Sequence, residues 1–285
     1  SATYGAGVVT TDGNINTVII KGGTYTGNGY NQANIKQAIT DNDIIAAQKV
    51  SLARFSVSKG KTFIGDTVLM SGNGGVNQGG AIYNSGTATF SRCAFTKNVA
   101  NYGSAIYNED TVTVSDTVFF GNTGLMGHGG AIYNERTATF TGSVFSDNKT
   151  DNAGGAIISH GTMVFSGCTF RGNTANTGGG AISNSGTATI SDSLFSKNVA
   201  ISDIGAHGGA IENSKTLIIS GSTFSDNVTN DYGVIYSSEI AAFTDCLFIG
   251  NTAGKGGAIF STHGTATISG CTFSNNKAKE GGALY

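Results

Sequence analysis

Few side chains of this chain could do chemistry, and their spacing keeps them apart. His128 and His207 stand at the same point of a repeated motif, three copies of the motif apart. His160 and His263 share another point, four copies apart. If each copy is one layer of stacked strands, these separations are about 14 Å and about 19 Å. Metal ligands lie about 2 Å from their ion, so we expect no metal site.

The carboxylates are also dispersed, because aspartates recur about once per copy where a turn is expected. They are Asp116, Asp147, Asp192, Asp226 and Asp245. A polysaccharide hydrolase needs two carboxyl groups within about 10 Å in one cleft. The sequence therefore predicts a protein that is not an enzyme and uses no cofactor. A polysaccharide lyase or hydrolase is the less favoured alternative.

Two repeated sequence motifs predict the secondary structure that must position these residues. Gly-Gly-Ala-Ile recurs in nine copies, some degenerate, separated by 24 to 29 residues, which is the regularity of a solenoid. The third positions of the motif are Ala81, Ala105, Ala131, Ala156, Ala181, Ala210, Val234, Ala258 and Ala283. A second motif, Phe-x-x-Asn, runs in phase with the first over eight copies. Its phenylalanines are Phe95, Phe119, Phe145, Phe170, Phe195, Phe224, Phe248 and Phe273.

Each copy contains three short runs of β-forming residues, for example 80–83, 87–90 and 93–95, separated by Asn, Ser and Gly. This pattern predicts an all-β fold: a single right-handed parallel β-helix (solenoid) over residues 62–285, with three strands per turn of about 25 residues. Residues 1–61 lack the motifs. We expect them to form an N-terminal capping region with imperfect turns and a short amphipathic helix over residues 31–40.

The repeat also predicts which side chains face inward. Successive residues of a strand point to opposite sides, so the apolar positions of Ile82, Ala88, Phe90 and Phe95 are expected to face the core, and the variable position 83 to face out. Asparagines at two corners are expected to form ladders, in which each amide bonds to the copies above and below it.

The four cysteines stand two residues before the motif phenylalanine, as small fillers of the core. We expect mostly free thiols. A bridge between Cys246 and Cys271, which belong to adjacent turns, stays open.

Gly-Gly-Ala-Ile tetrapeptides alternating with Phe-x-x-Asn over about residues 62–285 resemble the repeats of chlamydial polymorphic membrane proteins and related β-helical autotransporter passengers. The resemblance implies a secreted passenger that is displayed on the outer surface and acts in adhesion to host cells. It also implies that an outer-membrane β-barrel follows the passenger. The motifs themselves are structural turns, so the resemblance implies no binding residues.

Threonines form two columns on the outward side of the second predicted strand. The first column holds Thr62, Thr87, Thr111, Thr137, Thr162, Thr187, Thr216 and Thr265, and the second holds Thr89, Thr113, Thr139, Thr189 and Thr267. High β propensity on a solvated strand is one explanation. The alternative is a planar binding face, since Thr-x-Thr columns on β-solenoids resemble those of ice-binding proteins. Val164, Ile218, Ile240 and Ala242 interrupt the columns, which weakens the ice interpretation.

The segment between the Asn of Phe-x-x-Asn and the next Gly-Gly varies in length from copy to copy. Segments 123–128 and 199–207 exceed the four or five residues found elsewhere. Loops that lengthen on a constant scaffold often carry recognition, although neutral insertion explains them equally well. We therefore include Ile201, Ser202, Asp203 and Ile204 among the candidate binding residues.

Charge and hydropathy exclude some partners. A formal net charge of -2 provides no basic field for nucleic acid, and no run of 18 apolar residues predicts a membrane span. We expect an extracellular, surface-displayed adhesion module for a protein or glycan on a host or neighbouring cell. Ice or polysaccharide is the alternative partner, and self-association at the strand edge near Tyr285 is another.

Overall fold

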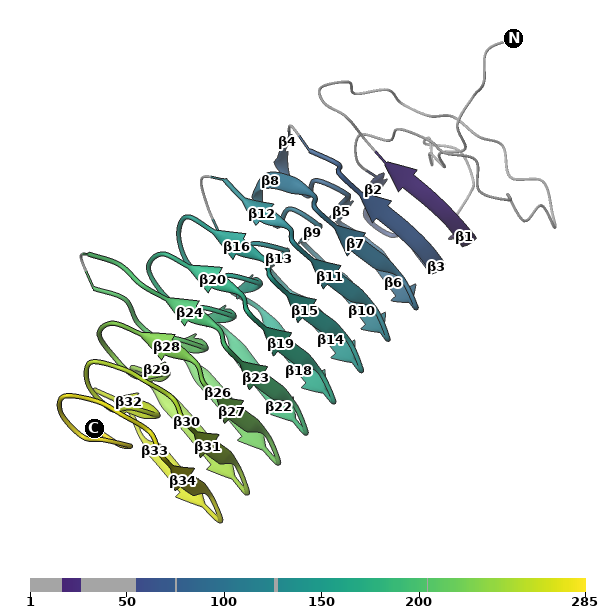
Figure 1. Cartoon of the computed structure of the whole chain (residues 1–285). Coiled ribbons are helices and arrows are strands. Elements are labelled where there is room, and N and C mark those ends of the chain that lie inside the picture. The colour runs from purple at the N-terminus through teal and green to yellow at the C-terminus, as the bar shows by residue number, and fades with distance from the viewer. Residues whose placement is uncertain (1–16, 27–54, 75, 126–127, 204) are drawn as a thin grey trace, which may run out of the picture.

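The computed structural model describes residues 17–26, 55–74, 76–125, 128–203 and 205–285, which form a parallel β-helix (Figure 1). Every strand pairing in these residues is parallel and joins equivalent strands of successive turns, as β6 and β14 do on either side of β10. The described residues contain no helix. The helix predicted over residues 31–40 lies outside them.

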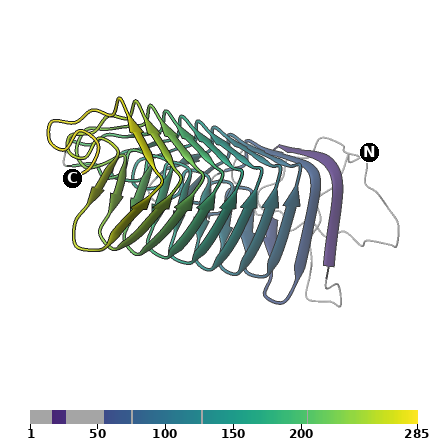
Figure 2. The same ribbon diagram turned by 90° about the horizontal axis from the view of Figure 1, so that it is seen from below.

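The strands form three sheets along the solenoid, and Figure 2 shows the strands side by side along its length. Sheet A contains β1 (Thr17–Thr26), β3 (Thr62–Ser71), β6 (Thr87–Ser91), β7 (Ala94–Thr96), β10 (Thr111–Ser115), β11 (Val118–Phe120), β14 (Thr137–Thr141), β15 (Val144–Ser146), β18 (Thr162–Ser166), β19 (Thr169–Arg171), β22 (Thr187–Ser191), β23 (Leu194–Ser196), β26 (Thr216–Ser220), β27 (Thr223–Ser225), β30 (Ile240–Thr244), β31 (Leu247–Ile249), β33 (Ala266–Ser269) and β34 (Thr272–Ser274). Sheet B contains β2 (Phe55–Val57), β5 (Ile82–Asn84), β9 (Ile106–Asn108), β13 (Ile132–Asn134), β17 (Ile157–Ser159), β21 (Ile182–Asn184), β25 (Ile211–Asn213), β29 (Ile235–Ser237) and β32 (Ile259–Ser261). Sheet C contains β4 (Val76–Gln78), β8 (Val99–Tyr102), β12 (Thr123–Gly124), β16 (Lys149–Thr150), β20 (Thr174–Ala175), β24 (Val199–Ala200) and β28 (Val228–Thr229).

The predicted all-β parallel β-helix with turns of about 25 residues is confirmed, and the structure adds a fourth strand to most turns. The second and third predicted strands of a turn, such as β6 and β7, both belong to sheet A, and the short strands of sheet C were not predicted. Strands of residues 17–26 and 55–57 already stack on the repeats, since β1 pairs with β3 and β2 pairs with β5.

The phenylalanines of Phe-x-x-Asn form one continuous stack inside sheet A. From Phe95 to Phe273 neighbouring rings are parallel to within 10°, with centroids 4.6 to 5.0 Å apart. This separation is close to the strand spacing of about 4.8 Å. The register therefore places each ring directly above its equivalent. Ile82, Ala88 and Phe90 are buried beside the stack, as predicted.

The asparagine of the same motif forms the predicted ladder. Asn148 Nδ2 donates to Phe119 O at 2.9 Å and to Asn173 Oδ1 at 3.0 Å. Asn173 Oδ1 also accepts from the backbone N–H of Asn148 at 3.1 Å. The ladder is fully buried from Asn98 to Asn251. Each amide therefore satisfies the polar groups of its neighbours inside the core.

A second amide ladder marks the corner between sheets B and A. Asn84 Nδ2 donates to Asn108 Oδ1 at 2.6 Å, and Asn108 Nδ2 donates to Asn134 Oδ1 at 2.7 Å. Serine replaces the amide at position 159, where its hydroxyl accepts from Asn134 at 2.9 Å. In most turns this corner lies immediately before the sheet A strand that begins with a threonine of the first column.

The recurrent aspartates stand at corners whose backbone is left-handed. Asp116 has a φ of 49°, at the bend between β10 and β11, and Asp147 has a φ of 54° at the next corner. Each of the five aspartates is followed, one turn later, by a glycine at the same corner. A Cβ on Gly142 would lie 2.6 Å from Asp116 Oδ1, so the carboxylate occupies the space that glycine leaves free. The aspartates are corner residues, as expected.

All four cysteines are free, and three of them are buried. The backbone N–H of Cys246 donates to Cys271 Sγ at 3.4 Å, one turn away. Burial raises the pKa of Cys246 to about 11. The thiol of Cys246 is therefore protonated and unreactive at neutral pH.

Replacing Asn173 by Ala should lower the free energy of unfolding by about 3 kcal/mol, because it removes buried hydrogen bonds to Phe145, Asn148 and Asn198. Asn176→Ala is the matched control. Asn176 is exposed, so its loss should stay within about 0.5 kcal/mol. Urea unfolding of both variants measures the difference, and equal midpoints would show that the ladder does not stabilise the core.

Candidate binding surfaces

The predicted threonine columns lie together on the outer surface of sheet A. The register runs without a break through Thr62, Thr87, Thr111, Thr137, Thr162, Thr187 and Thr216. The second column pairs Thr89, Thr113 and Thr139, is interrupted at Val164, and resumes at Thr189. Thr265 and Thr267 are exposed in the last turn. The structure therefore confirms where these residues lie, and their role in binding stays a prediction.

A third column, which sequence reasoning missed, runs beside them at the strand ends. It consists of hydroxyl residues: Ser91, Ser115, Thr141, Ser166, Ser191, Ser220, Thr244 and Ser269. The signal in the sequence is Thr-x-Thr-x-Ser rather than Thr-x-Thr. Neighbouring columns are about 6.6 to 6.8 Å apart along a strand. Successive residues of one column, which lie on neighbouring strands, are about 4.8 Å apart. We call the outward side of sheet A from β3 to β34 the threonine face.

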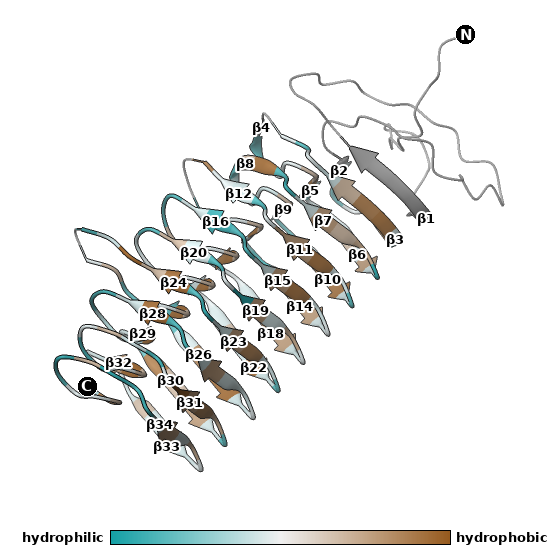
Figure 3. Ribbon diagram, viewed as in Figure 1, coloured by the Kyte–Doolittle hydropathy of each residue, from teal (hydrophilic) through white to brown (hydrophobic). Residues whose placement is uncertain are grey.

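The strands of the threonine face are almost free of charge, and the exposed charged residues Arg92, Asp116, Asp192 and Asp245 stand at the bend between the two strands of a turn. Among strands β3 to β34 of sheet A the only charged residues are Asp66 and Arg171. Asp66 is already paired with Arg92 at 2.6 Å, and hydrogen bonds from Ser91 and from Arg92 lower the pKa of Asp66. Exposed aliphatic side chains, such as Ile218 and Ile240, share the face. Figure 3 shows apolar residues gathered in these strands and hydrophilic residues at the corners.

The longer loop lies elsewhere. Residues 201–207 follow β24 and lead to β25, so the loop stands between sheets C and B and does not border the threonine face. Ile201 is 51% exposed and Asp203 is exposed, whereas Asn230 Nδ2 donates to Ser202 O at 2.7 Å. Ile204 lies outside the described residues. The structure therefore does not bring the two predicted binding regions together.

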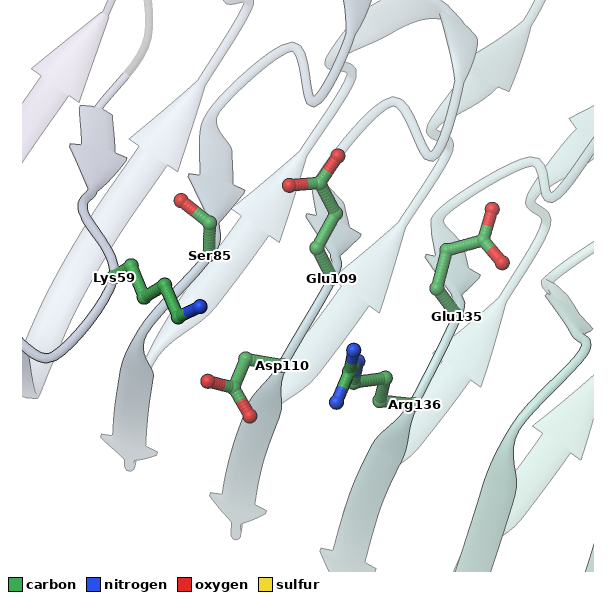
Figure 4. Close-up of a pocket in the computed structure, with 6 residues that line it drawn as sticks. All are labelled: Lys59, Ser85, Glu109, Asp110, Glu135 and Arg136. Carbon is green, nitrogen blue, oxygen red and sulfur yellow. The ribbon is translucent and has the colours of Figure 1, made fainter.

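Charged residues gather in a hollow at the corner between sheets B and A (Figure 4), which sequence reasoning did not predict. Its volume is about 380 Å³, and it spans four consecutive turns, which follow β2, β5, β9 and β13. It is lined by Lys59, Ser85, Glu109, Asp110, Glu135 and Arg136, a set that we call the corner hollow. Figure 4 shows Glu109 and Glu135 extending in the same direction from adjacent turns. Residues 85, 109 and 135 each follow the corner asparagine of their turn, and an alignment of the turns at that asparagine would have revealed the hollow.

Tyrosines of sheet B border the corner hollow. Tyr107 and Tyr133 stack with ring centroids 4.9 Å apart, and the Tyr107 hydroxyl donates to Glu135 Oε1 at 3.4 Å. Burial is the largest cause of a raised pKa at both tyrosines, and the negative charge of Glu135 is the second. Together they raise the pKa of Tyr133 to about 12, and they also raise the pKa of Tyr107. The Tyr133 hydroxyl lies 3.0 Å from His160 Nε2. Both hydroxyls therefore stay protonated across the physiological range.

The corner hollow reopens the question of catalysis. Glu109 and Glu135 belong to successive turns, so their backbones are about 4.8 Å apart, close enough for the two carboxyl groups to reach the separation of about 5 to 10 Å that glycoside hydrolysis needs. However, both side chains are partly exposed, whereas a general acid requires a carboxyl shielded from water. In the part of the chain that the structure describes, no three His, Cys, Asp or Glu residues lie close enough to hold a metal ion. The arrangement is better suited to hydrogen bonding than to proton transfer.

Comparisons with known proteins agree with this architecture. A right-handed β-helix region matches residues 150–285, and the chlamydial polymorphic membrane protein repeat matches residues 116–135. A search of the curated proteins and a search of the solved structures found no match. The polymorphic membrane proteins are associated with the outer membrane and the cell surface. Among the described residues no helix is long and apolar enough to cross a membrane. The chain is therefore a right-handed parallel β-helix that carries the chlamydial polymorphic membrane protein repeat.

Proposed function

We propose that this chain is an extracellular, non-enzymatic adhesion module that contacts a protein or glycan on another cell through its threonine face. The observation that carries the proposal is the in-register surface of sheet A, whose strands carry almost no charge over the whole repeat region. Charged side chains must be desolvated when a surface is covered, and such desolvation is costly. A broad face with almost no charge avoids that cost.

The repeat itself supports surface display. Proteins with this repeat are surface-associated, and a rigid solenoid presents the same face over many turns. Hydroxyl groups of threonine and serine both donate and accept hydrogen bonds, and the threonine methyl groups provide apolar contact. Such a face suits a partner that is polar but uncharged. The loop at residues 201–207 is a second proposed contact, on a different side of the solenoid.

Placing two lysines in the centre of the threonine face should abolish adhesion. Thr113→Lys with Thr139→Lys should weaken binding to a panel of animal and bacterial cells at least tenfold, because the new charges would be buried against the partner. Flow cytometry with fluorescently labelled protein measures the binding, and circular dichroism verifies the fold.

Thr174→Lys with Thr252→Lys is the matched control, since both residues are exposed but lie outside sheet A. This control should bind cells like the unaltered chain. Equal loss in the two double variants would show that charge alone, and not the threonine face, governs adhesion. Deletion of residues 201–206 tests the loop separately, and unchanged binding would remove the loop from the proposal.

An ordered surface, ice or crystalline polysaccharide, is a second candidate partner. The observation that favours it is the seven-threonine column, whose members repeat at one fixed spacing. The second column is interrupted at Val164, Ile218 and Ala242. Breaks in the lattice make an ordered surface the weaker candidate.

Thermal hysteresis separates the two candidates. If the partner is a cell-surface molecule, the chain should not depress the freezing point of water below its melting point or shape ice crystals. Measurable hysteresis that Thr137→Tyr abolishes would favour ice over cell adhesion, because the bulky ring would disrupt the centre of the column.

A further inference from the structure

The charged groups of the corner hollow are not neutralised by one another. The three ion pairs of the described residues are Arg92–Asp66, His207–Glu212 and Lys255–Glu280, and none of them involves the hollow. Asp110 accepts from the Thr111 hydroxyl at 3.3 Å, and Glu135 accepts from Tyr107. Within the described part of the chain, the side chains of Lys59, Glu109 and Arg136 make no hydrogen bond or ion pair. Donors and acceptors of both signs are therefore available together to a ligand.

The repeat does not require charged residues at this corner. Asp110 and Arg136 occupy a register that holds glycine in the turns on either side, at Gly86 and Gly161. A Cβ on Gly86 would lie within 2.4 Å of backbone oxygens of the preceding turn. The turns that hold glycine at this register, at Gly86, Gly161, Gly186 and Gly264, thus leave no room for a side chain. Asp110 and Arg136 place ionised side chains of opposite sign at this register in two successive turns, as Lys215 and Glu239 do later, but only the first pair lies beside Lys59, Glu109 and Glu135 in the hollow.

The lining selects a class of ligand. An anion would be repelled by the three carboxylates, and a cation by Lys59 and Arg136. A neutral molecule with several adjacent hydroxyl groups matches the lining, because each hydroxyl can donate to a carboxylate and accept from an ammonium or guanidinium group. The volume of about 380 Å³ is near the lower end for ligand pockets, about 300 to 1,000 Å³, so the ligand is small.

The corner hollow lies beside the first threonine column of the threonine face. Each lining pair precedes a threonine of the first column: Ser85 and Gly86 lead to Thr87, Glu109 and Asp110 to Thr111, and Glu135 and Arg136 to Thr137. The backbone N–H of Thr137 donates to Asp110 O at 3.0 Å, which fixes the two surfaces to each other. A chain molecule seated in the hollow at one end can therefore continue across the hydroxyl groups of sheet A.

We propose that the corner hollow binds the terminal residue of a neutral glycan, whose following residues lie on the threonine face. This inference rests on the proposed adhesion function, and it names the partner as a carbohydrate. Lys59, Arg136 and the carboxylates of Glu109, Asp110 and Glu135 hold the hydroxyl groups of the terminal sugar. The tyrosine hydroxyls beside Glu135 keep that carboxylate oriented.

The test is binding of the unaltered chain to an array of neutral, sialylated and sulfated glycans, followed by titration calorimetry with the best ligand. Binding should be confined to neutral glycans. Arg136→Met and Asp110→Asn should each weaken it at least tenfold. Lys215→Met and Glu239→Gln are matched controls, because they alter exposed charged residues at the same register in later turns, and they should bind like the unaltered chain.

Three outcomes would overturn the inference: recognition of sialylated or sulfated glycans alone, no glycan bound at all, or equal effects of hollow and control variants. Chromatography of the glycans after incubation should show no cleavage, and products that Glu135→Gln abolishes would make the hollow an active site instead. Cell binding distinguishes this failure from failure of the adhesion proposal. If cells are bound through the threonine face but no glycan is bound, only the carbohydrate inference is wrong.

Discussion

Each buried amide of the Phe-x-x-Asn column finds its partner in the same residue of the next turn, and this requirement governs the rest of the structure. An amide in a core must have its donors and acceptors satisfied, and here only the neighbouring turn can supply them. The turns must therefore stay in register. A slip of one residue would also exchange the inner and outer side chains of every strand, so the phenylalanine stack and the amide ladder depend on the same alignment.

This alignment separates the parts of each turn that can vary from those that cannot. Inward positions are occupied by stacked equivalents, and the left-handed corners accept glycine or a few polar residues. Outward positions of the strands and the residues after each corner asparagine carry no such restriction. The threonine face uses the first kind of position, where repetition gives a uniform surface. The corner hollow uses the second kind, where the residue types change from one turn to the next.

Much of the fold could be predicted from the sequence because repetition makes the pattern visible. The phased motifs established the parallel β-helix, and alternation along strands such as 87–91 identified the inner and outer sides. The strands of sheet C were missed, since a two-residue strand such as β12 (Thr123–Gly124) has no alternation to detect. Its existence depends on pairing with β8 and β16 rather than on its own residues.

The candidate site was only half visible. The threonine columns repeat, so spacing revealed them, whereas the corner hollow is built from residues of different types in four turns. Glu109 and Glu135 are 26 residues apart in the sequence and become neighbours only because the intervening residues close one turn. Reasoning that looked for repeated residues therefore passed over the place where the repeat is broken.

The aspartate and glycine pairs at the left-handed corners have a consequence for how such a protein can change length. Asp192 lies against Gly221, and Asp245 follows in the next turn. Excision of the single turn that contains Gly221 would place Asp245 at the corner where Gly221 now gives the Asp192 carboxylate space and a neutral neighbour. The turns look interchangeable but have an order, so gain or loss of repeats by recombination would be tolerated at some junctions and rejected at others.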